Sequence, residues 1–284
     1  MHLTTYATAA DFVDAVRPTL GEREAEHHLV LGVAEAVVTG RAPNADLFAA
    51  SVHDEAGLAL AAFMTRERPL LIASDRDDVA AASALLWDAA AASPHRPAHV
   101  IGAVGQADVV VREWERREGR SARVGMRQRV YRLTSVEPLP PPSGGLRIAT
   151  PGDIDLVAEW MAAFEAEALA AVVPQSTRGS VERRIAAGEV YLWCDPEPRT
   201  MAASARPTRR AVAVNGVYTP PEWRRRGYAT ACVAELSGRL LERGFEFCVL
   251  YTDLENPTSN AIYTRIGYRP VRDFLMYALP NGQP

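Results

Sequence analysis

The sequence predicts an α/β (α+β) protein built from two tandem copies of one fold, each with a central sheet flanked by helices. The order of strands and helices in the second half of the chain can also be found in the first half. A seam of prolines and glycines, EPLPPPSGG at 137–145, divides the chain near its middle, and this composition suits a linker. The length of 284 residues allows each half its own core. We therefore predict a first domain at 1–137, a linker at 138–145 and a second domain at 146–284.

In the first half, apolar periodicity predicts a strand, two helices, three strands, a helix, a strand, a helix and a strand, in that order. The expected strands are 2–6, 47–52, 58–64, 70–73, 98–104 and 124–133. The expected helices are 10–17, 21–38, 77–92 and 107–118.

In the second half, capping and turn signals support the same order. Thr150 and Asp153 offer an N-cap and a first-turn acid for a helix that carries Leu156, Trp160, Phe164 and Ala168. Further helices are expected at 181–187, 227–243 and 257–266, and Gly188 and Gly244 are expected to end the first two. The expected strands are 146–149, 189–194, 200–205, 211–218 and 247–252, with one or two closing strands within 268–279. The turn at 195–198 makes a hairpin of two of them.

Composition excludes several classes of function. A chain with 48% hydrophobic residues, 23% charged residues and a formal net charge of -4 is typical of soluble globular proteins and not of proteins that coat nucleic acids. All 31 basic residues are arginine, so no lysine can form a Schiff base or serve a P-loop. Arginine without lysine, together with many alanines, also indicates the GC-rich coding typical of actinobacteria.

The cysteines and histidines show no metal-ligand spacing, and no metal is expected. The cysteines are separated along the chain in apolar stretches, which predicts buried free thiols. The N-terminal segment has neither a basic start nor an apolar run, and no stretch approaches 18 uninterrupted apolar residues. We expect a cytoplasmic protein that binds neither membranes nor nucleic acids.

The segment VNGVYTPPEWRRRGYATACVAEL places Gly227 between the end of a strand and the start of a helix. The small residues Ala229 and Thr230 follow it, so that a ligand can approach the backbone. N–H groups of a first helical turn point at such a ligand, and the helix dipole favours negative charge. Arg224, Arg225 and Arg226 add positive charge. The segment therefore suits a pyrophosphate, although alone it could equally be a solvated basic loop.

The wider context resembles the GNAT superfamily of N-acetyltransferases, whose acyl-CoA signature Q/R-x-x-G-x-G/A follows a central strand. Here the signature runs from Arg224 through Gly227 to Ala229. The segment LYTDLENPTSNAIYTRIGYRPV resembles the second motif of the family, with Asn256 before a short helix and Tyr263 within it. The resemblance covers about 146–279 and implies a mixed, mostly antiparallel sheet flanked by helices, with acetyl-CoA as cosubstrate.

The resemblance also implies a role for each matching residue. Tyr263 would donate a proton to the leaving thiolate, and Asn256 would hydrogen-bond the CoA arm. The main chain of Val217 and Tyr218 would receive the pantetheine and polarise the thioester carbonyl. The pyrophosphate would be bound by the backbone of the loop and first turn, which comprises Arg224, Arg225, Arg226, Gly227, Tyr228, Ala229 and Thr230. The alternative for Tyr263 is a packing residue on an amphipathic helix.

An amine acceptor arrives protonated, so a group must accept a proton before the attack. The family has no universal residue for this step. Glu165 and Glu167, on the first helix of the second domain, are candidates, as are Asp253 and Glu255 after the 247–252 strand. A plain solvated carboxylate remains the alternative for each of the four, and a water chain could serve instead.

The first half lacks the signature. Its equivalent helix is preceded by DRDD, which contains no glycine and puts three aspartates where a pyrophosphate would lie. The first domain is therefore expected to be a degenerate copy without a CoA site, which shapes the acceptor pocket or serves dimerisation.

Two functions remain open for the whole chain. One is acetyl-CoA-dependent transfer to a primary amine of a small molecule or peptide, and the other is a sensor that binds acyl-CoA without turnover. The acidic balance weakly favours a cationic acceptor. The chain is expected to be a monomer or a homodimer.

Overall fold

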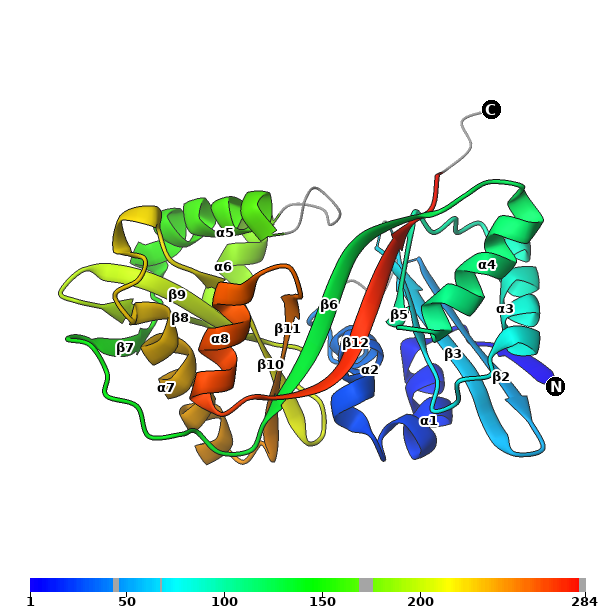
Figure 1. Ribbon diagram of the computed structural model, residues 1–284, viewed down its shortest axis with the longest axis horizontal. Helices are drawn as coiled ribbons and strands as arrows, with labels where there is room; N and C mark the ends of the chain where they lie inside the picture. Colours follow the sequence, from blue (N-terminus) through cyan, green and yellow to red (C-terminus); the bar gives the residue numbers. More distant parts are fainter. Residues whose placement is uncertain (43–45, 67, 169–175, 281–284) are drawn as a thin grey trace. The chain divides into compact units, whose positions relative to one another are not determined.

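The computed structural model describes residues 1–42, 46–66, 68–168 and 176–280 of the chain. The chain forms two compact units (Figure 1). One comprises Met1–Val130 with Val271–Pro284, and the other comprises Tyr131–Pro270. The domains expected from the sequence, 1–137 and 146–284, differ from these units mainly at the end, because the last strand of the chain is part of the first unit.

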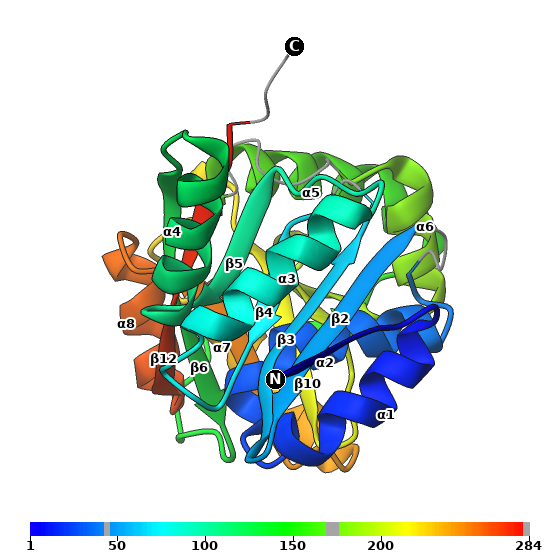
Figure 2. The ribbon, with the colours of Figure 1, turned by 90° about the vertical axis from the view of Figure 1, so that its right-hand side faces the viewer.

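The first unit is a sheet with two helices on each face (Figure 2). Its strands follow the order β1-β2-β3-β4-β5-β12, with β6 next to β12. Neighbouring strands from β1 to β4, and β5 with β12, are antiparallel, whereas β4 and β5 are parallel. Helices α1 and α2 cover one face, and α3 and α4 cover the other. The elements are β1 His2–Thr5, α1 Ala9–Leu20, α2 Glu24–Val38, β2 Leu47–Asp54, β3 Gly57–Thr65, β4 Leu70–Ala73, α3 Ala80–Ala92, β5 His99–Ala103, α4 Gln106–Glu118 and β6 Arg123–Leu133.

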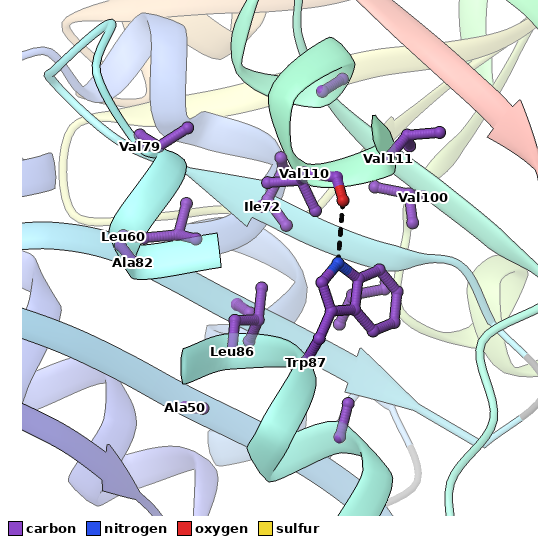
Figure 3. Close-up of a cluster of buried hydrophobic side chains, with 14 of the residues drawn as sticks. Ala50, Leu60, Ile72, Val79, Ala82, Leu86, Trp87, Val100, Val110 and Val111 are labelled. Carbon is purple, nitrogen blue, oxygen red and sulfur yellow. Dashed lines mark hydrogen bonds between the residues drawn. The ribbon is translucent and has the colours of Figure 1, made fainter. Parts of the chain in front are cut away.

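Trp87 of α3 lies in the core between the sheet and helices α3 and α4 (Figure 3). Its ring is 5% exposed, and its indole N–H donates to the Val110 carbonyl oxygen at 2.8 Å. Because a buried indole N–H is costly without a partner, this hydrogen bond fixes α3 against α4.

The second unit repeats the arrangement. Its sheet has the order β11-β10-β9-β8-β7, in which only β10 and β11 are parallel. Helices α5 and α6 pack on one face, and α7 and α8 pack on the other. The elements are β7 Gly145–Ile148, the 3-10 helix Pro151–Asp153, α5 Ile154–Ala168, α6 Arg178–Ala186, β8 Val190–Cys194, β9 Pro198–Ala205, β10 Ala211–Tyr218, a 3-10 helix Pro221–Trp223, α7 Tyr228–Glu242, β11 Phe247–Asp253, α8 Pro257–Ile266 and β12 Arg269–Ala278.

The two halves thus have the same order of elements, as the sequence predicts, but their last strands are exchanged. Strand β12 pairs with β5 through Phe274 to Ala278 and belongs to the first unit from Val271 onwards. Conversely, β6 ends in the second unit, where Tyr131 and Leu133 join the core of α7 and α8. Each sheet is therefore completed by a strand from the other half of the sequence.

None of the helices among the described residues has an apolar run long enough to span a bilayer.

Candidate functional site

Helix α7 begins with a turn that suits an anion. Its N-cap, Gly227, has a φ of 85°, and Arg225 has a φ of 62°. A Cβ added at Gly227 would meet only Pro142 Cδ, at 4.0 Å, so the left-handed backbone and not a lack of space favours glycine. The first helical hydrogen bond runs from Ala231 N to Gly227 O at 3.0 Å. The earlier N–H groups of the turn have no acceptor within the helix and can donate to a ligand.

Tyr228, Ala229 and Thr230 form this first turn. The Tyr228 ring is buried, and its hydroxyl donates to Asp195 Oδ2 at 2.6 Å. The Ser143 hydroxyl donates to the same oxygen at 2.6 Å. The Tyr228 hydrogen bond holds the start of α7 against the turn between β8 and β9, and the Ser143 hydrogen bond ties the segment before β7 to the same turn.

The exposed arginines before Gly227 make different contacts. Arg224 donates from Nη2 to both carboxylate oxygens of Glu167, at 2.9 and 2.8 Å, and from Nε to Thr219 O at 2.8 Å. The guanidinium of Arg226 lies 4.9 Å from the ring centroid of Trp223. The positive charge of Arg224 is thus paired with the carboxylate of Glu167. The guanidinium of Arg226 lies against Trp223, beside the turn.

A groove of about 630 Å³ runs along α7 from the turn at Gly227. On α7 it has small residues, among them Gly227, Ala231, Ala234 and Gly238. Its other residues are Val136, Glu137, Leu139, Pro140, Pro141, Pro142, Trp193, Arg226, Thr230, Glu235, Arg239, Glu242 and Arg265. A long ligand anchored by a phosphate at the turn therefore has room along the helix, between walls that carry both signs of charge.

Strands β10 and β11 separate towards their ends. Among the described residues their parallel register extends only to Ala213 opposite Val249, although both strands continue beyond these residues. On its other side, β10 has a bulge, since its register with β9 shifts between Asn215 and Tyr218, and Gly216 has a φ of 59°. This opening exposes backbone in the middle of the sheet.

Val217 and Tyr218 end β10 at this opening, where the sequence predicts the pantetheine contact. The Val217 side chain packs against the core of α7 and α8. The Tyr218 side chain packs on the opposite face, with its ring centroid 6.2 Å from that of Trp160. The Tyr218 carbonyl oxygen accepts a hydrogen bond from Thr200 Oγ1 at 2.7 Å, so this oxygen is already engaged.

Tyr263 of α8 lies in the same core as the first turn of α7. Its side chain is 8% exposed, and its ring meets that of Tyr268 edge-on at 6.0 Å. Burial raises the pKa of Tyr263 to about 12, because the phenolate would lack water around it. The phenol therefore keeps its proton at neutral pH and can act as a hydrogen-bond donor.

Asn256 caps helix α8. Its Oδ1 accepts from Ser259 N at 3.0 Å, which leaves its amide N–H groups available to a ligand. Asn260 strengthens the same turn, since its Nδ2 donates to the carbonyl oxygens of Asp253 and Asn256 at 2.9 and 2.7 Å. The helix that carries Tyr263 thus starts at a fixed position.

Each of the four candidate bases has a defined place. Glu165 accepts from the Ser176 N–H and hydroxyl, at 2.8 and 2.5 Å, and Glu167 is held by Arg224. Asp253 Oδ1 accepts from Glu255 N at 2.9 Å. Glu255 itself is exposed. The structure therefore places Glu165 and Glu167 on α5, Asp253 at the end of β11 and Glu255 just after it, without selecting one as the base.

Polar residues that the sequence analysis did not single out lie on the α5 and α6 face of the second unit. They are Arg184 of α6, Arg206 after β9, Asn215 of β10 and Tyr251 of β11. One signal was available, because Asn215 is the polar residue in the otherwise apolar run of β10. The arginines, by contrast, could not be told from surface residues by sequence.

The corresponding turn of the first unit has different chemistry. Helix α3 starts after Val79 without a glycine, and Asp78 Oδ1 accepts from Ala80 N at 3.4 Å. Gln106 Nε2 donates to the Ser74 and Arg76 carbonyl oxygens, both at 2.8 Å. A carboxylate of the protein thus occupies the position at which α7 offers its N–H groups.

Among the residues that the structure describes, no three His, Cys, Asp or Glu side chains are grouped so that they could hold a metal ion.

Comparison with known proteins points to one fold for the whole chain. A GCN5-related N-acetyltransferase from Sphaerobacter thermophilus is 18% identical, with a TM-score of 0.59, and the match covers 97% of this chain and 94% of that one. A tandem GNAT protein from the clavulanic acid biosynthesis pathway is 13% identical, with a TM-score of 0.57 over 100% of both chains. The chain has a tandem GNAT fold.

A third solved structure, of a Drosophila protein, matches this chain with a TM-score of 0.69 and 13% identity over 99% of both chains. The family model described as FR47-like protein matches residues 197–275, which include the anion-binding turn and Tyr263. No curated protein matches the sequence. The solved structures thus match the fold of nearly the whole chain, and the FR47-like match lies within its second half.

Proposed function

We propose that the second unit is an acetyl-CoA-dependent N-acetyltransferase that acts on a primary amine of a small molecule or peptide by direct transfer. The observation that carries this proposal is the anion-binding turn at Gly227, whose next residue, Tyr228, lies in one hydrophobic core with Tyr263. The groove along α7, 630 Å³ in volume, adds the room that a long phosphorylated ligand needs. These features fit a CoA thioester, which supplies an activated acetyl group when bound.

In this proposal the residues of the chain have separate tasks. The first-turn N–H groups of α7, with Arg226 nearby, bind the pyrophosphate, and the Asn256 amide orients the arm. Tyr263 holds its proton at the phenol oxygen and donates a hydrogen bond to the departing sulfur. Because its pKa of about 12 lies above the roughly 8.5 of an ordinary thiol, hydrogen-bond donation is favoured over complete proton transfer.

The first unit is proposed to bind no acyl-CoA, because Asp78 occupies the start of α3 and its carboxylate would repel a phosphate. Titration calorimetry with acetyl-CoA should therefore give one site per chain. Two sites of comparable affinity would refute this part of the proposal.

Thiol release tests the activity. Acetyl-CoA is incubated with a panel of amines, and we expect free CoA to appear only with a suitable acceptor, together with the N-acetylated product by mass spectrometry. Tyr263→Phe should bind acetyl-CoA as the wild type does but release thiol about 10²-fold more slowly. An equal rate in the variant would remove Tyr263 from the mechanism.

A sensor without turnover is the second candidate. It is favoured by the engagement of Glu165 with Ser176 and of Glu167 with Arg224, which leaves neither carboxylate ready to take a proton. Acetyl-CoA binding without thiol release across the whole amine panel would support the sensor and contradict the enzyme.

A further inference from the structure

Four polar residues meet on the α5 and α6 face where β10 and β11 separate. Asn215 and Tyr251 each lie two residues beyond the last paired residues, Ala213 and Val249. Since Val214 and Leu250 belong to the core of α7 and α8, strand alternation places Asn215 and Tyr251 on the opposite face. There they are close to Arg184 and Arg206, and we call these four residues the arginine cluster.

Arg184 is held in place by the protein. Its Nη2 donates to Asn215 Oδ1 at 3.0 Å and to Ser204 O at 3.3 Å, and its Nε lies 3.7 Å from Glu189 Oε2. Burial lowers the pKa of Arg184, while the charges of Glu189 and Glu165 raise it. Arg184 therefore has acidic neighbours of its own.

Arg206 is in a different position. Its Nε is buried and has no hydrogen-bond partner among the described residues, although the residue as a whole is only partly buried. Burial lowers the pKa of Arg206, and the nearby charge of Arg184 lowers it further, whereas Tyr251 raises it. The backbone of Arg206 is also left-handed, with a φ of 48°, a conformation that costs energy outside glycine.

A guanidinium keeps its charge at any ordinary pH. Burying such a charge beside a second one is unfavourable unless an anion compensates it. Carboxylates are the anions that match the planar fork of arginine best. The arginine cluster thus has the properties of an anion site whose anion comes from outside the chain.

We propose that Arg206, supported by Arg184, binds a carboxylate of the acceptor, so that the acceptor is an amine that also carries a carboxylate, as an amino acid does. This inference rests on the proposed acetyl transfer. The anion-binding turn of α7 lies on the other face of the sheet, so the two anion sites are separate. Glu165, a candidate base, acts on Arg184 and so lies on the acceptor's side. The overall charge of -4 weakly favours cationic acceptors, whereas the buried Nε of Arg206 favours an anionic group at the site itself.

The wild-type protein gives the first test. Amino acids that represent all side-chain classes are compared with the matching amides and decarboxylated amines as acceptors, for example phenylalanine with phenylalaninamide and phenethylamine. The proposal expects the best acid to exceed its amide and amine at least about tenfold in kcat/KM. Equal or better use of the uncharged partners across the panel would overturn it.

Variants give the second test. Arg206→Gln should raise KM for the carboxylate acceptor at least about tenfold, without changing KM for acetyl-CoA. Arg183 is an exposed residue of the same helix as Arg184. Arg183→Gln is therefore the matched control, and it should change neither KM. A uniform loss with acids and amines alike would contradict carboxylate binding. If Arg206→Gln does not fold, the wild-type comparison still decides.

A direct binding measurement separates this inference from the proposed function. If acetyl-CoA binds but no acceptor reacts, the transfer proposal fails, and calorimetry with acetate and the amino acid panel tests the cluster alone. Binding that is lost in Arg206→Gln but kept in Arg183→Gln supports the anion site. No binding of any carboxylate to the wild type refutes it.

Discussion

Glycine serves two different purposes within helix α7. Gly227 needs its left-handed φ of 85°, whereas Gly238 is an ordinary helical residue whose added Cβ would meet Val136 Cγ2 at 3.9 Å, a normal contact. Substituting alanine at each of the two positions therefore separates two effects. One is the strain of a left-handed backbone, and the other is the loss of the conformational freedom of glycine.

We expect Gly227→Ala to destabilise the protein by about 1–2 kcal/mol, because a left-handed residue with a Cβ is strained. It should also weaken acetyl-CoA binding, since the turn must relax. Gly238→Ala should stabilise by about 0.5–1 kcal/mol and leave binding unchanged. Urea unfolding measures the stability of each variant, and calorimetry measures its affinity for acetyl-CoA. The same effect of both substitutions would contradict the role of the turn.

The buried phenol of Tyr263 predicts a loss of stability in alkali. Its folded pKa of about 12 exceeds the unfolded value of about 10, so the native state favours the protonated form. The contribution, about 2–3 kcal/mol, is complete below pH 10 and is lost as the pH rises through 12. Tyr263→Phe should lose less stability than the wild type between pH 9 and 11.5 in urea unfolding, and parallel losses would speak against the raised pKa.

The motif positions of Gly227 and Tyr263 make them candidates for the donor site, but the sequence does not show their contacts. The structure puts Tyr228, the residue after Gly227, in one hydrophobic core with Tyr263. The pair between Arg224 and Glu167 could not be predicted, because it joins residues far apart in the chain and depends on how α5 packs. The same holds for Arg184 and Arg206, whose burial is decided by tertiary structure.

At the scale of elements, the start of α5 is fixed by a carboxylate. Asp153 accepts from Thr150 N at 2.7 Å and Thr150 Oγ1 at 2.8 Å, and from both Nη atoms of Arg147 at 2.7 Å. The hydrogen bond with Arg147 contributes most, and together with those from Thr150 it holds the pKa of Asp153 well below its usual range. The helix that carries Trp160 and the candidate bases is thereby anchored to β7.

Asp153→Asn should destabilise the second unit by about 1–2 kcal/mol, because a capping, charge-assisted carboxylate is lost. Since the folded pKa is lowered, the wild-type contribution is present above pH about 4 and lost as the pH falls, so the two proteins should converge in acid. Asp155→Asn is the control: its exposed pair with Arg178 should contribute little. Urea unfolding at pH 7 and at pH 3 gives the comparison, and a constant difference would contradict the expectation.

Element order follows from periodicity, but element ends do not. The helix predicted at 10–17 continues through Pro18 to Leu20, because buried Phe12, Val16 and Leu20 hold one face against the core despite the missing N–H. The helix expected from 77 begins at Ala80, where Asp78 Oδ1 accepts from Ala80 N, and Asp75 before it is held by His27. Tertiary contacts, which the sequence does not display, set both ends.

At the scale of the molecule, the exchanged strands tie each unit to a distant part of the chain. Periodicity identifies a closing strand within 268–279 but cannot say which sheet it joins. In the first unit, Phe274, Leu275 and Met276 are buried, and Asp273 accepts two hydrogen bonds from Arg129, at 2.6 and 2.8 Å.

A chain shortened after Pro270 should therefore lose stability chiefly in its first unit, by several kcal/mol, because three buried side chains and a strand are removed. A chain shortened after Pro280 keeps β12 and should match the full-length protein. Hydrogen exchange read separately for each unit tests this, and a loss of protection confined to Tyr131–Pro270 would contradict the strand exchange.

The exchange of β6 and β12 also has a consequence for the order in which the protein matures during translation. Domains generally fold as they emerge, the N-terminal one first, but here the first sheet lacks its neighbour for β5 until β12 has been made. Through that interval β5 presents an unpaired edge, which is open to association with other nascent chains. The first unit, although translated first, is thus the last to be completed, and a chaperone that shields nascent strands should raise the yield of the whole protein.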